Sequence, residues 1–198
     1  QAIRECDQII VHSTDETALL TDVCRILRTI AGYRLAWIGS VDHDESKSIR
    51  PLVWHGDGDY LTSVNITWAD TDRGRGPTGS AARTGKTHFF QDFATASDAE
   101  PWRKAALSRG YRSSIAIPLK DSDGSVFAVL SLYSPEPNSF NSDEIRLLEE
   151  LASDISFGII ALRERAKRHQ AELESAHLAS FPELNPNPII ELETSGKI

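Results

Sequence analysis

The chain has 198 residues, 40% of them hydrophobic and 25% charged, which is the composition of an ordinary globular domain. Its net charge of −8 argues against nucleic acid as a partner, because neutralising phosphates requires a basic surface. No apolar run reaches the roughly 18 residues of a membrane span, no signal peptide opens the chain, and two cysteines are too few for a disulfide framework. We therefore expect a cytoplasmic protein without membrane insertion. The sequence lacks methionine, so we also expect a fragment or a processed form.

The first part of the chain predicts two helices followed by a β-hairpin. Apolar residues spaced three and four apart predict a helix over residues 2–11. A second apolar stripe, from Leu19 to Ile30, predicts a helix that Ser13 or Thr14 caps and that stops at Gly32. Residues 34–41 and 49–55 predict two strands, which the charged turn "DHDESKS" joins. This turn lacks the glycine that a calcium loop needs at its sixth position, so we interpret it as a solvated turn.

The stretch "RGRGPTGSAARTGKT", residues 73–87, resembles two nucleotide-binding motifs. A phosphate-binding P-loop needs a glycine five residues before its G-K-[ST] end, but that position holds Ser80. The G-x-G-x-x-G match fails in context, because the polar segment "WADTDR" precedes it where a dinucleotide fold requires a buried strand. Pro77 is typical of the first residue of a helix. We therefore expect a loop and a short helix over 77–84, and no nucleotide site of either kind.

The next part of the chain predicts the remaining strands of a sheet. "THFFQDF" predicts a strand, and residues 99–110 predict a short helix. "SSIAIPL" and "SVFAVLSLY" predict two strands that an Asp-Gly turn joins into a hairpin. Side chains alternate between the two faces of a strand. The last two strands therefore place aliphatic residues on one face, toward helices, and Ser114, Ala116, Ser131 and Tyr133 on the other. Small and polar groups on that second face leave room for a ligand.

The longest predicted element is a helix that Ser142 caps and that runs from near Asp143 to about Ser180. Its apolar residues step by three and four from Ile145 to Ala176, which is a heptad pattern typical of a coiled coil. We expect its first half to pack on a domain and its second half to leave as a stalk. We predict a parallel homodimer through this helix and the N-terminal one, with the interface residues Ile3, Ile10, Ile155, Ile159 and Leu162. "FPELNPNP" then ends the helix, and "IIELETSGKI" indicates the start of a further domain.

Several of these strings together resemble a GAF domain of bacterial signalling proteins. They are "YRLAWIGSVDHDE", "ITWADTDRGRGPTGSAARTGK", "PWRKAALSRGYRSSIAIPLKDSDGSVFAVLSLYSPEPNSF" and "LLEELASDISFGIIALR". The resemblance implies an α+β fold with a central, mostly antiparallel sheet, helices on both faces and a long C-terminal signalling helix. It divides the chain into an N-terminal helix (1–12), a GAF domain (13–162), a coiled-coil linker helix (163–184) and the beginning of a truncated PAS domain (185–198), since "NPNPIIELETSGKI" is similar to the opening of a PAS domain.

The resemblance implies a sensory, regulatory module rather than an enzyme. Such modules bind a small ligand and relay a signal through a dimeric helix to a downstream PAS and output domain, which would be a histidine kinase, a diguanylate cyclase or a phosphodiesterase. A ligand-free dimerisation spacer is the alternative. A GAF-type methionine sulfoxide reductase is a remote one, because that chemistry needs pocket cysteines, whereas Cys6 and Cys24 fall on helices before the sheet begins.

A set of aromatic, arginine and small residues is the candidate ligand-binding site. Aromatic walls with a few polar groups build small-molecule pockets, and arginine suits a carboxylate or phosphate. A structural role for most of these residues is the alternative. The ligand itself is unknown. Bilin is disfavoured because neither cysteine precedes a histidine, and haem is disfavoured because the histidines fall at turns or beside a strand. No pair of histidines or cysteines has the spacing of zinc ligands. The predicted ligand-binding residues are Trp37, Trp54, Trp68, Arg75, Trp102, Arg109, Tyr111, Ser114, Ser131 and Tyr133; we predict no catalytic and no metal-binding residue.

Overall fold

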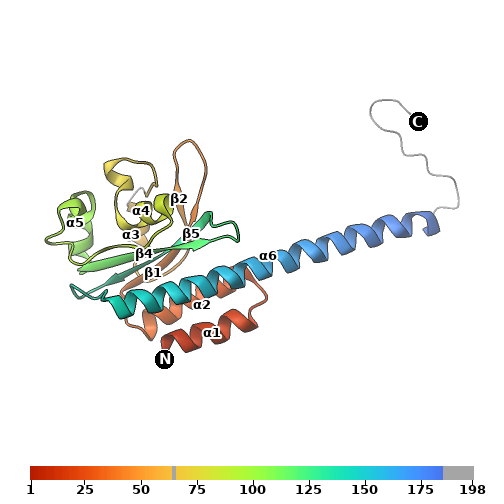
Figure 1. The fold of residues 1–198 in the computed structure, drawn as a ribbon, viewed down its shortest axis with the longest axis horizontal. Helices are drawn as coiled ribbons and strands as arrows, with labels where there is room; N and C mark the ends of the chain where they lie inside the picture. The colour runs from red at the N-terminus through yellow and green to blue at the C-terminus, as the bar shows by residue number, and fades with distance from the viewer. Residues whose placement is uncertain (64–65, 185–198) are drawn as a thin grey trace. The chain divides into compact units, whose positions relative to one another are not determined.

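The computed structural model describes the backbone of residues 1–63 and 66–184 and shows an α+β fold around one five-stranded antiparallel sheet (Figure 1). The strands lie in the order β2-β1-β5-β4-β3. Their bounds are β1 Leu35–Val41, β2 Ile49–His55, β3 His88–Phe90, β4 Ser113–Lys120 and β5 Val126–Ser134. The two predicted hairpins are present, since β1 pairs with β2 and β4 with β5. The pairing of β1 with β5 joins these hairpins into one sheet, with Trp37 opposite Ser131.

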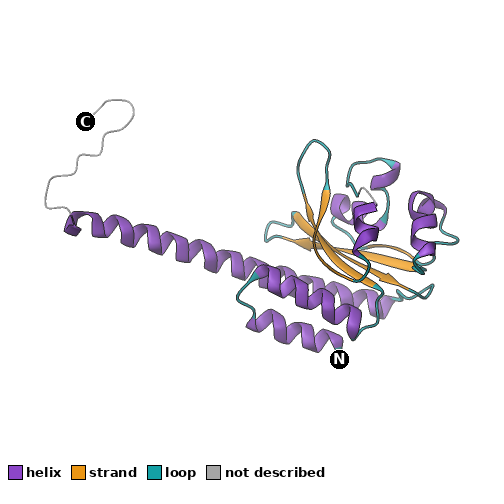
Figure 2. Cartoon of the chain, turned by 180° about the vertical axis from the view of Figure 1, so that it is seen from behind, coloured by secondary structure: helices purple, strands orange, loops and turns teal. Residues whose placement is uncertain are grey.

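Helices cover both faces of the sheet (Figure 2). One face carries α1 (Ala2–His12), α2 (Glu16–Thr29) and the first part of α6, a helix that runs from Ser142 to Leu184. The other face carries three short helices, α3 (Gly58–Ser63), α4 (Pro77–Thr84) and α5 (Glu100–Ser108). Short 3₁₀ turns at Asp72–Gly74 and Ser97–Ala99 precede α4 and α5. This arrangement matches the predicted fold class, with helices on both faces of an antiparallel sheet.

The residues that cap two of the helices differ from the predicted ones. Asp15, not Ser13 or Thr14, accepts a hydrogen bond from the Ala18 backbone N–H (2.7 Å) and begins α2. Asn141 accepts one from the Glu144 N–H (2.9 Å) at the start of α6. A short side-chain oxygen at the N-cap satisfies an N–H group that has no partner within the helix, and several neighbouring residues are equally suited to it by type. The sequence therefore places these helix starts only to within one or two residues.

The chain forms two compact units, residues 1–160 and residues 161–198. The first unit contains the sheet and the helices that cover it. In the second, α6 continues to Leu184, and residues 164–177 are exposed. The predicted PAS segment, residues 185–198, lies outside the described residues. Within the described part of the chain, no helix combines the length and apolar character that crossing a bilayer requires.

Two of the predicted dimer contacts lie instead in the core of their own chain. Ile155 and Ile159 are fully buried, because the face of α6 that carries them packs on the sheet. Ser156, on the same face, accepts a hydrogen bond from the Lys120 N–H (3.2 Å). The heptad residues of this part of α6 therefore pack inside the domain. Periodicity alone cannot distinguish a helix that packs on its own domain from one that packs in a coiled coil. Ile3, Ile10 and Leu162 are only partly buried in the single chain.

Gly158 allows α1 to pack closely against α6. A Cβ atom added at Gly158 would lie 2.8 Å from the Ile10 Cγ2 atom, which is closer than van der Waals contact. The partly buried Ile10 is therefore engaged within its own chain, at the point where the two helices meet.

We predict that the effect of Gly158→Ala on stability depends on residue 10. Alanine favours the helix by about 1 kcal/mol over glycine, but overpacking costs about 1–3 kcal/mol. Gly158→Ala should therefore lower the free energy of unfolding in the wild type and raise it in an Ile10→Ala background, where the obstructing methyl group is absent. Urea denaturation of the four proteins measures this coupling. An equal effect of Gly158→Ala in both backgrounds would show that Ile10 does not limit the approach of the helices.

Candidate functional site

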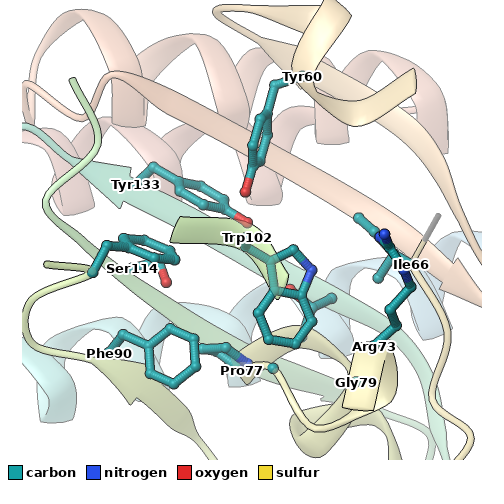
Figure 3. A pocket seen from close by; sticks show the side chains of 12 residues that line it. Tyr60, Ile66, Arg73, Pro77, Gly79, Phe90, Trp102, Ser114 and Tyr133 are labelled. Carbon is teal, nitrogen blue, oxygen red and sulfur yellow. The ribbon is translucent and has the colours of Figure 1, made fainter. Parts of the chain in front are cut away.

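A pocket lies between the sheet and the short helices of its second face. Figure 3 shows side chains from α3, α4, α5, β3, β4 and β5 converging on it. Alternation along β4 and β5 turns Ser114 and Tyr133 toward this face, while α5 brings Trp102 over it. The residues that line the pocket are Tyr60, Ile66, Arg73, Gly76, Pro77, Thr78, Gly79, Phe90, Phe93, Trp102, Ser114 and Tyr133.

The pocket is almost filled by aromatic side chains. The space that a water-sized sphere can occupy inside it is about 20 Å³, which is room for about one water molecule. Small-molecule sites usually measure about 300–1,000 Å³. The Phe93 ring stacks on Tyr133 with ring centroids 6.1 Å apart, and Phe90 packs edge-on against Phe93 at 5.4 Å. In this conformation the pocket is a packed core that has a small cavity at its centre.

Several polar groups nevertheless face this cavity. The buried Ser114 Oγ atom has no hydrogen-bond partner among the described residues, and such a group costs about 1–3 kcal/mol when it stays unpaired. The helix α4 begins at the pocket with Pro77, and no side chain caps it. The N–H groups of its first turn have no partners inside the helix, so this end attracts negative charge. Arg73 lies at the same rim and forms no ion pair within the described chain.

The hydroxyl groups around the pocket are donors at neutral pH. Burial raises the pKa of Tyr60 to about 12, and a hydrogen bond with Tyr133 and the charge of Arg109 oppose this only in part. Burial likewise raises the pKa of Tyr133 well above its ordinary value. Thr78 and Ser131 hydrogen-bond to each other through their hydroxyl groups (3.0 Å), which ties α4 to β5. The pocket therefore offers neutral hydroxyl and N–H groups together with one free guanidinium.

The structure brings only part of the predicted site together. Trp102, Ser114 and Tyr133 line the pocket, Ser131 supports its wall, and Trp37 is buried in the apolar cluster beside it. The remaining predicted residues point elsewhere. Trp54 is 49% exposed on the edge strand β2, and the Trp68 indole N–H donates a hydrogen bond to the Asp42 carbonyl (2.8 Å). Two of the predicted arginines form ion pairs outside the pocket, Arg75 with Asp70 (2.9 Å) and Arg109 with Asp57 (2.9 Å). Tyr111 lines a different depression.

Other lining residues were not predicted. Tyr60 lies on α3, a six-residue helix that is too short to show a periodic pattern in the sequence. Phe90 and Phe93 belong to or follow a strand of only three residues, in which alternation is not informative. Thr78 and Gly79 fall in the glycine run that the sequence assigns to a loop and helix start.

The glycines of residues 73–87 permit close approach of backbone segments. A Cβ atom added at Gly79 would lie 2.3 Å from the Gly74 carbonyl oxygen and 2.4 Å from that of Thr67. One added at Gly76 would lie 2.8 Å from the Trp102 ring. These glycines therefore let α4 lie against the preceding loop and let Trp102 cover the pocket, and their spacing reflects packing rather than a phosphate motif.

The two cysteines lie on the helical face opposite the pocket. Cys6 on α1 and Cys24 on α2 are fully buried. Burial raises the pKa of each thiol to about 12, so both remain protonated at neutral pH. Thiol chemistry requires the thiolate. Among the described residues, no group of three or more histidine, cysteine or acidic side chains is arranged to hold a metal ion.

The chain belongs to the GAF domain family, whose sequence profile matches residues 13–160. No protein of curated function matches it. A free methionine-R-sulfoxide reductase from Neisseria meningitidis, solved with its substrate, superposes with a TM-score of 0.67 at 23% identity over 83% of this chain and 89% of its own. The GAF domain of an Acinetobacter phosphoenolpyruvate-protein phosphotransferase superposes with a TM-score of 0.63 at 14% identity, over 84% of this chain and 95% of its own. A GAF domain from A. aeolicus in an inactive state superposes with a TM-score of 0.58 at 15% identity, over 83% of this chain and 94% of its own. At these identities the likeness establishes the fold.

We predict that Gly79→Ala destabilises the domain strongly. The added methyl group would meet two backbone carbonyl oxygens, which cannot rotate away as a side chain can, so the free energy of unfolding should fall by about 3 kcal/mol. For a domain of this size that corresponds to a drop in melting temperature of roughly 6–12 °C. Differential scanning calorimetry measures it.

Gly85→Ala, at the other end of α4, is the matched control. A Cβ atom added at Gly85 would have no neighbour closer than 3.6 Å, so alanine meets no steric obstacle there. Only the left-handed backbone conformation (φ +64°) opposes it, which lowers the free energy of unfolding by about 1 kcal/mol. Equal losses from both variants would contradict a steric role for Gly79.

Proposed function

We propose that this chain is a regulatory GAF module that binds a small anionic or polar ligand in the inner pocket. The signal passes along α6 to a downstream PAS domain and an output domain of the histidine kinase, diguanylate cyclase or phosphodiesterase type. Membership of the GAF family and the sensor-type GAF domains among its structural neighbours support a regulatory role. A ligand that prefers one of two packings of the helices shifts the population toward that packing.

The observation that carries the proposal is a buried, unpartnered Ser114 hydroxyl that faces the uncapped N-terminus of α4. A side chain with no ligand role at this position would be expected to be apolar or paired, since most buried polar groups in proteins have a partner. Arg73 adds a free positive charge at the rim. A carboxylate seated here would accept hydrogen bonds from Ser114 and from the first turn of α4, and it would neutralise Arg73.

Ligand binding requires the pocket to widen. The present cavity of about 20 Å³ holds no molecule larger than water. We propose Trp102 as the wall that moves, because its side chain packs on Gly76 and Phe90 and forms no hydrogen bond among the described residues, whereas the strand face beneath is fixed by the sheet. Displacing this indole ring would enlarge the pocket without breaking a backbone hydrogen bond of the sheet.

The second candidate function, a ligand-free dimerisation spacer, is favoured by the small size of the cavity. A module that only joins helices needs a packed core and no site. A methionine sulfoxide reductase activity gains no support from the residues, because neither Cys6 nor Cys24 lies on the pocket face of the sheet.

Native mass spectrometry separates the sensor from the spacer. We expect the native protein to carry a small molecule that is absent from the denatured spectrum, and we expect Ser114→Val, which removes the hydroxyl and fills the cavity, to abolish the extra mass. Ser113→Val is the neighbouring control, because the Ser113 hydroxyl bonds to the Glu136 carbonyl on the other face of the strand. A native mass equal to the chain alone, before and after incubation with small carboxylic acids, would favour the spacer.

We further propose a parallel homodimer through the exposed apolar residues of α6. Phe157 is 74% exposed and Leu173 53% exposed in the single chain, although both are large apolar side chains. Leu162 lies between them in the sequence and is partly buried. Burying such residues against a second copy would remove apolar surface from water.

Leu162→Glu should convert the dimer to a monomer with an intact sheet. Burying an unpaired carboxylate at a helical interface costs several kcal/mol. Sedimentation velocity reports the association state and circular dichroism the fold. Ile155→Glu is the contrasting variant and should unfold the domain, because Ile155 is buried within its own chain. A wild type that is monomeric at tens of micromolar, or a Leu162→Glu protein that stays dimeric, would show that α6 is not the interface.

A further inference from the structure

A second depression, separate from the inner pocket, gathers three arginines. It has a volume of about 530 Å³ and opens where α2 ends, β1 begins and α5 ends. Its walls include Arg28, Tyr33, Arg34, Asp57, Arg109 and Tyr111. It shares no lining residue with the inner pocket. Residues from three distant parts of the sequence therefore converge here only through the tertiary fold.

Positive charge is in excess in this depression. Arg109 forms an ion pair with Asp57, with 2.9 Å between Nε and Oδ2. Arg28 and Arg34 form no ion pair with any described residue. The nearby carboxylate of Glu144 accepts a hydrogen bond from the Tyr33 hydroxyl. Two guanidinium groups thus remain uncompensated, in a chain whose net charge is −8.

The Tyr111 hydroxyl adds a neutral donor to the same depression. The Tyr111 side chain is 1% exposed, and its Oη atom is buried with no hydrogen-bond partner among the described residues. Most buried hydroxyl groups in proteins have a partner, and a ligand oxygen or an ordered water would supply one here. Burial also raises the pKa of Tyr111 to about 12, which keeps this proton available for donation at neutral pH.

The two free guanidinium groups differ in how they are held. Arg34 precedes β1, and its guanidinium carbon lies 3.6 Å from where a Cβ of Gly110 would be, so it covers the loop between α5 and β4. Arg28 is at the end of α2, where its helix is anchored by the buried residues Ile26 and Leu27. Both side chains are exposed, and the planar guanidinium fork loses less entropy per hydrogen bond than a flexible ammonium group does.

We propose that this depression binds a phosphate group, either free or as part of a small phosphorylated metabolite. Two unpaired guanidinium groups balance a dianion, and a phosphate monoester carries nearly two negative charges at neutral pH. Arginine forks match the geometry of phosphate oxygens, and the Tyr111 hydroxyl donates to a further oxygen. A carboxylate has a single charge and would leave one arginine unpaired.

The site also adjoins the aromatic cluster of the inner pocket. The Tyr111 ring lies 5.3 Å from Tyr60 and 5.1 Å from Tyr133, measured between ring centroids. Both neighbours line the inner pocket. A phosphate that accepts a hydrogen bond from Tyr111 would therefore act on a neighbour of that pocket's wall, although phosphate binding itself requires no ligand there.

Titration with inorganic phosphate, followed by the backbone amide signals of Gly32 and Gly110 in ¹⁵N-labelled protein, tests the proposal. The titration is made at about pH 7.5, where phosphate is mainly dianionic, with sodium chloride and sodium acetate at matched ionic strength as comparisons. We expect a saturable shift with phosphate and weaker shifts with the other salts. Arg28→Gln and Arg34→Gln should each weaken binding about tenfold, as expected for the loss of a charge-assisted hydrogen bond.

Arg73→Gln is the matched control, because Arg73 lies at the inner pocket. It should leave the shifts at Gly32 and Gly110 unchanged. Shifts that are linear with concentration, that are equal for phosphate and acetate, or that saturate at the wild-type phosphate concentration in both Arg28→Gln and Arg34→Gln would overturn the proposal. Shifts centred on Gly76 and Gly79 that vanish in Arg73→Gln would place phosphate in the inner pocket instead, which would overturn this site and support the proposed ligand function.

Discussion

The burial of both faces of the central sheet is the constraint on which this structure depends. Strands β1, β4 and β5 are buried along nearly their whole length, so every residue on them must pack on one layer of helices or the other. Alternation sorts the side chains accordingly. Aliphatic residues such as Ile115 and Leu132 are buried, and their neighbours Ser114 and Tyr133 face the pocket. The position of the pocket on one face of the sheet and of the first part of α6 on the other follows from this division.

The second face of the sheet combines two opposing demands. Large aromatic rings exclude water and stabilise the domain, whereas a ligand site needs space and free polar groups. Here the rings nearly fill the pocket, yet the Ser114 hydroxyl and the first turn of α4 keep unpaired donors beside the remaining cavity. A site of this kind is closed until a wall moves. Under the proposed function, Trp102, which packs on Gly76, is the wall that moves.

Local properties of the sequence were sufficient to predict most of the fold. The hairpins, the helix stripes, the proline at the start of α4 and the Asp-Gly turn are short-range signals, and each produced the predicted element in the structure. The short helix α3 gave no such signal, because six residues do not complete two helical turns. The caps at Asp15 and Asn141 were displaced from their predicted positions for a similar reason, since several adjacent residues can serve as an N-cap.

The candidate site required the tertiary structure, because residue type does not reveal which way a side chain points between elements. The sequence by itself determined the fold family, and alternation turned Ser114, Ser131 and Tyr133 to the pocket face. Only the packing decided that Arg75 and Arg109 pair with Asp70 and Asp57 away from the pocket. It also decided that the heptad residues Ile155 and Ile159 face their own sheet. A heptad pattern records that one side of a helix is apolar, but the identity of the surface that covers it depends on how distant parts of the chain fold together.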